Sequence, residues 1–423
     1  MNTQKTNSLG PFLVLTFIYF IVGFLTTVNG QCQGPLKIAF LAHVEELKNT
    51  LTTLISFFFF LGYLLNSPLA GKWINLYGYK KTLMRALSIM TAGLLMYFLS
   101  SWFATHYGNL DIKIINDNVP VGYFILLVGS YLMGTSAALI QVVINPYIAA
   151  YELRGTQPVQ RMNIVCAVNS FGTTIAPFFV TAVMFAGVSL EDVQAGQLTV
   201  PFMAIAICVI VTALITNHLR LPDIQGTRAN IGEILERSIW SFRHLTLGVI
   251  AIFFYVGAEV AVGVNVNLHA MELYGLDSGI PALLATLYWG GMMVGRVISG
   301  MFNRISSRVQ LTVTTLSATI LTLIAIFTNN LWVLVSIGLC HSVMWGCIFT
   351  LAIKGLKKYT SLAAGVFMMG VFGGAVFPVL QGILADLLGS WQWTWMIVVA
   401  CELVMLYYAL SGSRIKDAEC LEE

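Results

Sequence analysis

Long apolar stretches separated by short polar segments run through the whole chain. Each stretch is continuous over about 20 residues or more, which is the length a helix needs to cross a bilayer, and a helix satisfies its own backbone groups in lipid. Strands of a membrane β-barrel would instead alternate over about ten residues. The pattern therefore predicts twelve transmembrane helices, at 10–32, 51–76, 82–104, 120–150, 162–187, 199–219, 245–271, 281–303, 309–328, 331–354, 361–388 and 392–412.

One long polar connection, residues 220–244, divides these stretches into six and six. Within it, "ANIGEILERSIWSF" has helical apolar spacing, which predicts a short amphipathic helix on the membrane surface. The two halves also resemble each other, since "FGTTIAP" at 171–177 corresponds to "FGGAVFP" at 372–378. We therefore expect an all-α membrane protein with two pseudo-symmetric bundles, 1–219 and 245–423, joined by the linker 220–244. A site between such halves is typical of secondary transporters.

Composition supports lipid as the main solvent of the chain. Hydrophobic residues make up 57% of the sequence and charged residues only 10%, too few to cover a water-soluble domain. The net charge of +3 comes without a basic stripe, so we expect no nucleic-acid partner. The seven cysteines lack paired spacing, which argues against a disulfide framework or a metal site. We expect a monomer whose first apolar stretch is a permanent helix, not a cleaved signal peptide.

Basic residues in the connections predict the orientation. With the N-terminus inside, eighteen of the 22 Lys and Arg residues fall in inside connections and three in outside connections. Short inside loops carry such an excess in membrane proteins. The sequence thus predicts a multi-pass protein of the cell's inner (plasma) membrane with both ends in the cytoplasm.

The apolar stretches carry no recognisable enzyme chemistry. They contain no His-x3-His pair, no carboxylate dyad and no phosphate-binding loop. We therefore expect a transporter, with no enzymatic activity, no cofactor and no use of ATP. A non-transporting membrane receptor for the same ligand is the alternative of a different class.

Several motifs resemble one family of transporters. The six-plus-six plan and the loop "GKWINLYGYKK" at 71–81 resemble the major facilitator superfamily, whose loop motif has an Asp where this chain has Asn75. The segments "YVGAEVAVG" (255–263), "YWGGMMVGR" (288–296), "NPYI" (145–148), "NSFGTTIAP" (169–177), "IFTLAIKGL" (348–356) and "GGAVFPVLQGILAD" (373–386) resemble its fucose permease and glucose/galactose permease branch, over about residues 11–410. The resemblance implies ion-driven import of a monosaccharide by alternating access. It also implies a cytoplasmic gate at Gly71, Gly78, Lys80, Lys81 and Arg85.

The chain departs from the proton-driven fucose permeases at two titratable positions. Those relatives have an Asn-Asp pair in the first span and a Glu four residues before the Asn-Pro of the fourth. Here the matching positions are Asn29–Gly30 and Gln141, and neither Gly nor Gln can carry a proton. H+ symport, Na+ symport and uncoupled facilitation therefore all remain open.

A sugar site needs amides, carboxylates or imidazoles for the hydroxyl groups and an aromatic ring for one face. Glu259 is the leading candidate for ion coupling, because an acidic residue at the centre of a span costs about 2.5–3.5 kcal/mol on insertion scales. The alternatives are a structural Glu held by a partner such as Arg296, amides that only bridge helices, and aromatic residues that only face lipid. Asp386 and Glu402 are expected to be structural. The expected sugar-binding residues are Asn29, Gln33, Gln141, Asn145, Asn169, Tyr255, Glu259, Trp289, His341 and Trp345.

Overall fold

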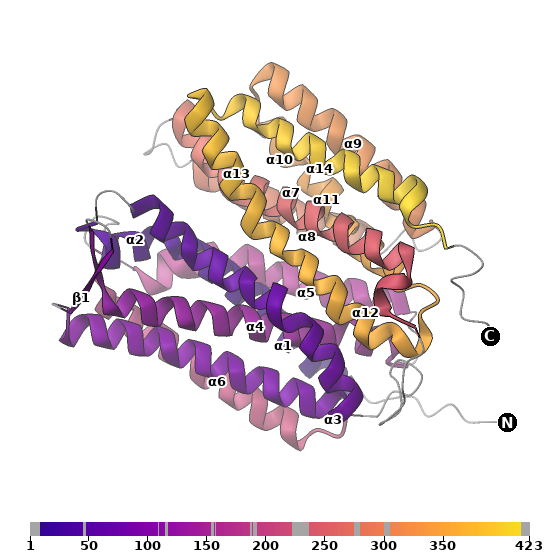
Figure 1. Cartoon of the computed structure of the whole chain (residues 1–423), viewed down its shortest axis with the longest axis horizontal. Helices are drawn as coiled ribbons and strands as arrows, with labels where there is room; N and C mark the ends of the chain where they lie inside the picture. Colours follow the sequence, from indigo (N-terminus) through magenta and orange to yellow (C-terminus); the bar gives the residue numbers. More distant parts are fainter. Residues whose placement is uncertain are drawn as a thin grey trace.

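The computed structural model describes residues 9–44, 48–108, 110–114, 117–153, 156, 158–186, 188, 193–221, 237–274, 280–299 and 305–415. Two helical bundles lie side by side, one from each half of the chain (Figure 1). The first contains α1 (Leu9–Gln31), α2 (Gln33–Leu41), α3 (Lys48–His106), α4 (Val121–Ala150), α5 (Pro158–Phe179), the π-helical turn η1 (Val180–Met184), the 3-10 turn η3 (Ala195–Leu198) and α6 (Thr199–His218).

The second bundle follows the 3-10 turn η4 (Ile239–Ser241). Some of its spans are built from more than one helical piece, as at α10–α11 and α12–η7–α13. Its elements are α7 (Arg243–Tyr274), α8 (Ile280–Ser299), α9 (Ser307–Thr328), α10 (Leu331–Ser336), α11 (Gly338–Ala352), η6 (Lys357–Tyr359), α12 (Thr360–Phe367), η7 (Met368–Phe372), α13 (Gly373–Leu388), η8 (Gln392–Trp395), α14 (Met396–Tyr407) and η9 (Tyr408–Gly412).

The expected all-helical membrane architecture is confirmed. Among the described residues, nine helical stretches are long and apolar enough to cross a membrane, and 164–179 and 283–299 form shorter apolar helices. One stretch, Leu54–His106, covers the two predicted spans at 51–76 and 82–104. Gly78 separates these spans, because its φ of 81° and ψ of 171° break the helix at a conformation that favours glycine. The count of twelve and the domain limits stay predictions.

Two local features were not predicted from the sequence. Residues Asp111–Ile114 (β1) and Asp117–Pro120 (β2) form an antiparallel pair between α3 and α4. The short helix α2 follows α1 after one residue, Cys32. The amphipathic helix expected at 229–242 falls mainly in 222–236, outside the described residues, and only the turn η4 is seen at its end.

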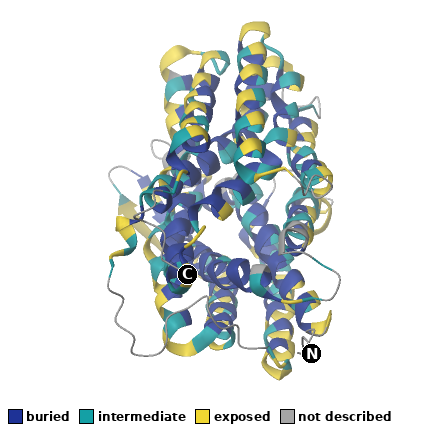
Figure 2. Cartoon of the chain, turned by 90° about the vertical axis from the view of Figure 1, so that its right-hand side faces the viewer, coloured by how far each residue is buried: buried dark blue, intermediate teal, exposed yellow. Residues whose placement is uncertain are grey.

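Buried residues gather where the bundles face one another, and exposed residues cover the outer faces (Figure 2). Large apolar side chains such as Phe178, Val200 and Phe327 are among those exposed, as lipid-facing positions require. The first residues of α1 and the last residues of η9 lie at the same end of the molecule (Figure 1). The described chain thus presents an apolar exterior and places its buried polar residues inside.

Close approach of backbones joins the bundles at α3 and α12. A Cβ at Gly71 would lie 2.6 Å from the carbonyl oxygen of Ser361, and one at Gly365 would lie 2.8 Å from that of Ser67. Ser361 Oγ also donates a hydrogen bond to Asn75 Oδ1 at 2.7 Å. Glycine at both crossings allows the two bundles to touch directly.

Candidate functional site

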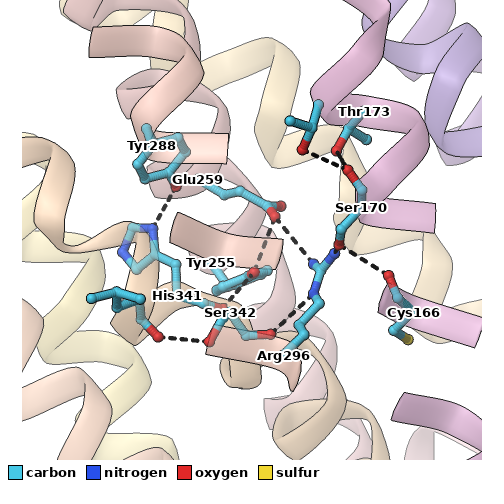
Figure 3. Close-up of polar contacts among 11 residues, drawn as sticks. Cys166, Ser170, Thr173, Tyr255, Glu259, Tyr288, Arg296, His341 and Ser342 are labelled. Atoms are coloured by element: carbon cyan, nitrogen blue, oxygen red, sulfur yellow. Dashed lines mark hydrogen bonds and ion pairs between the residues drawn. The ribbon is translucent and has the colours of Figure 1, made fainter. Parts of the chain in front are cut away.

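Arg296 joins the two bundles at the centre of a polar cluster (Figure 3). It lies in α8, and one of its terminal nitrogens is 3.9 Å from Glu259 Oε1 on α7. Its Nε donates to the backbone oxygen of Ser342 on α11 at 3.1 Å, and its other terminal nitrogen donates to Ser170 Oγ on α5. The two charged side chains are 16% and 14% exposed, so the pair is mostly withdrawn from solvent. One guanidinium therefore contacts a carboxylate in its own bundle and a hydroxyl in the other.

Tyr255 contacts the same oxygen of the Glu259 carboxylate as Arg296 does. It lies four residues earlier on the same face of α7, and its hydroxyl is 3.1 Å from Glu259 Oε1. The same hydroxyl is 3.0 Å from the backbone oxygen of His341. A phenol has one proton to donate, so Tyr255 can serve only one of these acceptors at a time.

A second polar chain lies deeper in the C-terminal bundle. Tyr288 Oη is 2.6 Å from His341 Nδ1, and His341 Nε2 is 2.6 Å from Glu402 Oε1. The side chains of His341 and Glu402 are fully buried. Glu402 was expected to be a structural residue of a peripheral span, but it faces the bundle interior and binds a predicted site residue. His341 has both ring nitrogens occupied by protein partners, and its role in sugar binding stays a prediction.

The predicted amides of the first bundle have different surroundings. Asn29 Oδ1 accepts hydrogen bonds from the hydroxyls of Tyr97 and Ser130, so it bridges α1, α3 and α4. Gln141 donates to the Tyr63 hydroxyl at 2.9 Å, which ties α4 to α3. The side chain of Gln33 lies outside the described part of the structure.

Asn145 and Asn169 both lie beside α1. Asn169 donates to the backbone oxygen of Tyr19 at 2.6 Å. Asn145 is fully buried, and its side chain interacts with the Tyr19 hydroxyl, but neither of its polar atoms forms a well-aligned hydrogen bond with a described residue. Tyr19 also interacts electrostatically with Arg296 and Tyr63, which places these amides in the same region as the Arg296 cluster. The described interior thus contains a buried amide with spare hydrogen-bonding capacity close to the boundary between bundles.

The two predicted tryptophans lie in the second bundle. Trp289 packs against Gly263, meets Tyr288 edge to face at 5.2 Å, and has a buried indole nitrogen without a described partner. Trp345 is half-buried and stacks on Phe349, with ring centroids 5.3 Å apart. Both residues therefore offer an aromatic ring, and Trp289 also has a buried N–H donor without a described partner.

The five residues of the predicted gate divide into two groups. Gly71 contacts the other bundle directly, as described above. Lys80 Nζ caps the end of α6 by donating to the backbone oxygens of Asn217 and Leu219 at 2.7 and 2.8 Å. Arg85 lies over the ring of Tyr77, and Lys81 is exposed. Gly78 forms the break in α3, so four of these residues shape the first bundle and one meets the second.

Sequence reasoning missed several residues that the structure brings into the site. Ser170 and Ser342 are Arg296 partners, and Tyr63 and Tyr288 hold Gln141 and His341. Hydroxyls inside apolar spans were the available signal, but such groups are common in membrane helices and only the three-dimensional contacts select them. The assembled groups suit a ligand rich in hydroxyls, since carboxylate, guanidinium, amide and indole N–H all bind such groups.

Comparison with known proteins agrees with this architecture. Residues 15–377 match the family model of the Major Facilitator Superfamily. A glucose/galactose transporter from Brucella abortus biovar 1 (strain 9-941) is 31% identical over 409 residues, which cover 95% of this chain and 93% of that protein. The L-fucose-proton symporter of Escherichia coli (strain K12) is 23% identical over 439 residues, covering 97% and 95%.

Solved structures show the same fold. A crystal structure of a variant of the E. coli fucose:proton symporter matches with a TM-score of 0.76 and 20% identity, covering 94% of this chain and 97% of that one. A structure of this symporter in the outward conformation matches with a TM-score of 0.72 and the same identity, covering 95% and 98%. The chain belongs to the major facilitator superfamily, in the branch that contains the fucose permeases and glucose/galactose permeases.

Proposed function

We propose that this protein imports a monosaccharide across the inner membrane by alternating access, driven by cotransport of H+. Twelve spans with both ends in the cytoplasm are part of the proposal, supported by the eighteen-to-three distribution of basic residues. The names of the relatives support a hexose such as glucose or galactose, or a deoxyhexose such as fucose; an amino sugar belongs to the same class of ligands.

The observation that carries the proposal is the position of Glu259 between Tyr255 and Arg296. The carboxylate is mostly buried, is held by a hydroxyl and a cation, and lies next to the residue that contacts the other bundle. A charged residue inside a membrane bundle is expensive and marks a substrate or ion pathway. Two buried groups with spare hydrogen-bonding capacity, the Asn145 amide and the Trp289 indole N–H, supply further donors or acceptors for a sugar.

The neighbouring cation favours H+ over Na+. Sodium needs several oxygen ligands around it, yet the guanidinium of Arg296 is 3.9 Å from the Glu259 oxygen. Arg296 disfavours any added positive charge at this carboxylate, and it also occupies space where the oxygen ligands of Na+ would have to lie. A proton instead forms a covalent O–H bond, removes the carboxylate charge and requires no coordination shell.

Protonation of Glu259 would change the contacts of Arg296. With the carboxylate neutral, the attraction between the two side chains falls and the guanidinium can favour Ser170 and Ser342. Since Ser170 belongs to the other bundle, the charge on Glu259 biases the contact between bundles. A ligand or proton that acts at Glu259 can thus shift the population of the two access states.

Uptake into proteoliposomes tests the proposal. We would measure accumulation of a panel of radiolabelled hexoses while H+ and Na+ gradients are imposed separately. H+-driven accumulation of at least one monosaccharide is expected. Accumulation driven by Na+ alone would contradict the choice of ion, and entry that stops at equal concentrations would indicate a facilitator. Binding without entry would indicate a receptor.

A further inference from the structure

We infer that the buried pair of His341 and Glu402 forms a second proton-binding site, whose occupancy is linked to the charge on Glu259. This inference rests on the proposed transport function. The inference goes beyond the proposed function because it assigns a role to Glu402, for which no contact with Glu259 or Arg296 is seen among the described residues. The pair lies one hydrogen bond away from Tyr288, which precedes the predicted sugar-facing Trp289.

The hydrogen bonds of Glu402 are too few for an ordinary carboxylate. Its side chain is fully buried, Oε1 has the single partner His341 Nε2, and Oε2 has no partner among the described residues. An ionised carboxylate held away from water needs a full set of donors or an opposite charge. One extra proton shared by Glu402 and His341 makes the pair neutral overall, and this removes the uncompensated negative charge.

Among the described residues, no permanently charged cation is in contact with the pair. The ionisable groups that interact with Glu402 there are Cys401 on its own helix, Cys340 and His341 on α11, Tyr255 on α7 and Tyr288 on α8. Helix α9, which also packs against α14, has no ionisable residue from 311 to 328. Arg296 and Glu259 lie beyond Tyr255. His341 is thus the direct partner of the Glu402 carboxyl group.

The hydroxyl of Tyr288 allows the pair to exist with or without the extra proton. Without it, Tyr288 donates to His341 Nδ1, and the Nε2–H donates to the Glu402 carboxylate. With it, Nδ1 carries a hydrogen and donates to the Tyr288 oxygen, and the hydrogen of the Nε2–Glu402 bond lies on the carboxyl oxygen, so that a neutral Glu402 carboxyl group donates to Nε2 of a neutral imidazole. One proton is added, no covalent bond between heavy atoms changes, and the Tyr288 hydroxyl hydrogen turns away from the ring.

The two carboxylate sites are coupled by electrostatics. The Tyr255 hydroxyl lies between Glu259 and the His341 backbone oxygen, so the two carboxyl groups are separated by one tyrosine and one histidine. Loss of the proton from Glu259 therefore favours the protonated form of the buried pair, and protonation of Glu259 disfavours it. Two interacting sites of this kind titrate together instead of independently.

Infrared difference spectroscopy on the purified protein tests proton binding without requiring transport. A protonated buried carboxyl group gives a carbonyl band that is lost when it ionises. We expect a band that changes with pH in the unsubstituted protein, is missing in Glu402→Gln and is altered in His341→Gln. The matched control is Glu272→Gln, which removes an exposed carboxylate of α7. A band unchanged in Glu402→Gln would overturn the inference.

Transport assays in Glu402→Gln test the functional link. This variant should keep exchange of radiolabelled D-galactose or D-glucose across equilibrated vesicles but lose H+-driven accumulation. Accumulation equal to that of the unsubstituted protein would overturn the inference, as would loss of exchange in a folded variant. If the unsubstituted protein accumulates no sugar, the proposed function fails, and the infrared result still decides whether the pair binds a proton.

A second measurement applies if these variants do not fold. Glutamate labelled with 13C shifts only glutamate carbonyl bands. Within the described long apolar helices, Glu259 and Glu402 are withdrawn from solvent, whereas Glu272 is exposed. In Glu259→Gln protein labelled in this way, a carboxyl carbonyl band that is shifted by 13C and changes with pH supports the inference. Absence of such a band contradicts it.

Discussion

Arg296 on α8 contacts Ser170 on α5, so a charged side chain of the second bundle is hydrogen-bonded to the first. The same guanidinium is paired with Glu259 and with the backbone of α11. Within the described chain this side chain thus ties the candidate coupling residue to the boundary between bundles. Any change in the charge at Glu259 acts on the contact that must break when the bundles move.

Glu259→Gln should abolish accumulation of sugar against a gradient. A glutamine keeps the shape and one hydrogen-bond acceptor for Tyr255, but it cannot take up or release a proton. Uptake should stop at equal concentrations on both sides, while exchange of sugar between equilibrated pools continues. Proteoliposomes loaded with unlabelled sugar measure both quantities. Glu272→Gln is the control, and accumulation by Glu259→Gln would show that Glu259 is not the coupling residue.

Arg296→Gln should destabilise the folded protein more than Glu259→Gln does. Removing the cation leaves a mostly buried carboxylate without its partner, which costs on the order of 3 kcal/mol. The double variant should recover part of this loss, because residues in direct contact are not additive. Unfolding midpoints of the two single variants and the double variant in detergent measure the coupling. Strictly additive losses would contradict an energetic role for the ion pair.

Gly71→Ala should weaken the contact between α3 and α12. The added Cβ would lie 2.6 Å from a backbone oxygen that cannot move alone, so the helices must separate. Reaction of Asn75→Cys with a membrane-impermeant maleimide, with and without Gly71→Ala, measures this opening. The maleimide should react faster with Asn75→Cys when Gly71→Ala is also present. Gly290→Ala is the control, since a Cβ there meets nothing within 4 Å, and equal rates in both proteins would contradict the prediction.

Asn145→Ala should mainly weaken sugar binding, whereas Asn29→Ala should mainly lower the stability of the protein. Asn145 has only a poorly aligned interaction with Tyr19 to lose, so its removal should raise the KM for sugar with little change in the unfolding midpoint. Asn29 accepts two hydrogen bonds between helices, and each is worth about 1 kcal/mol, so its removal should lower the midpoint. Uptake kinetics give the KM of both variants, and thermal unfolding gives their midpoints. Equal KM values for Asn145→Ala and the unsubstituted protein would remove Asn145 from the site.

Much of the fold could be predicted from the sequence, because lipid imposes long apolar helices and leaves few alternatives. The hairpin at 111–120 was missed since it lies in a polar connection without such a constraint. The paired spans 51–76 and 82–104 were separated correctly in the sequence by the glycine at 78, where the backbone turns.

The site was harder to predict, because helix spacing gives the face of a residue but not its partner in another helix. Glu259 and Tyr255 share one helix, so their contact follows from spacing of four residues. The contact between His341 and Glu402 joins residues 61 positions apart, and no pattern along the chain indicates it. Arg296 was considered only as a structural partner, whereas it contacts both bundles.

The contact between Asn75 and Ser361 is made by two uncharged side chains. Mobile ions screen attraction between opposite charges, but they hardly affect a hydrogen bond between an amide and a hydroxyl. The closure of the two halves at this end of the protein should therefore keep the same strength over a wide range of ionic strength. The balance between closed and open forms at this contact would then need no adjustment when the salt concentration changes.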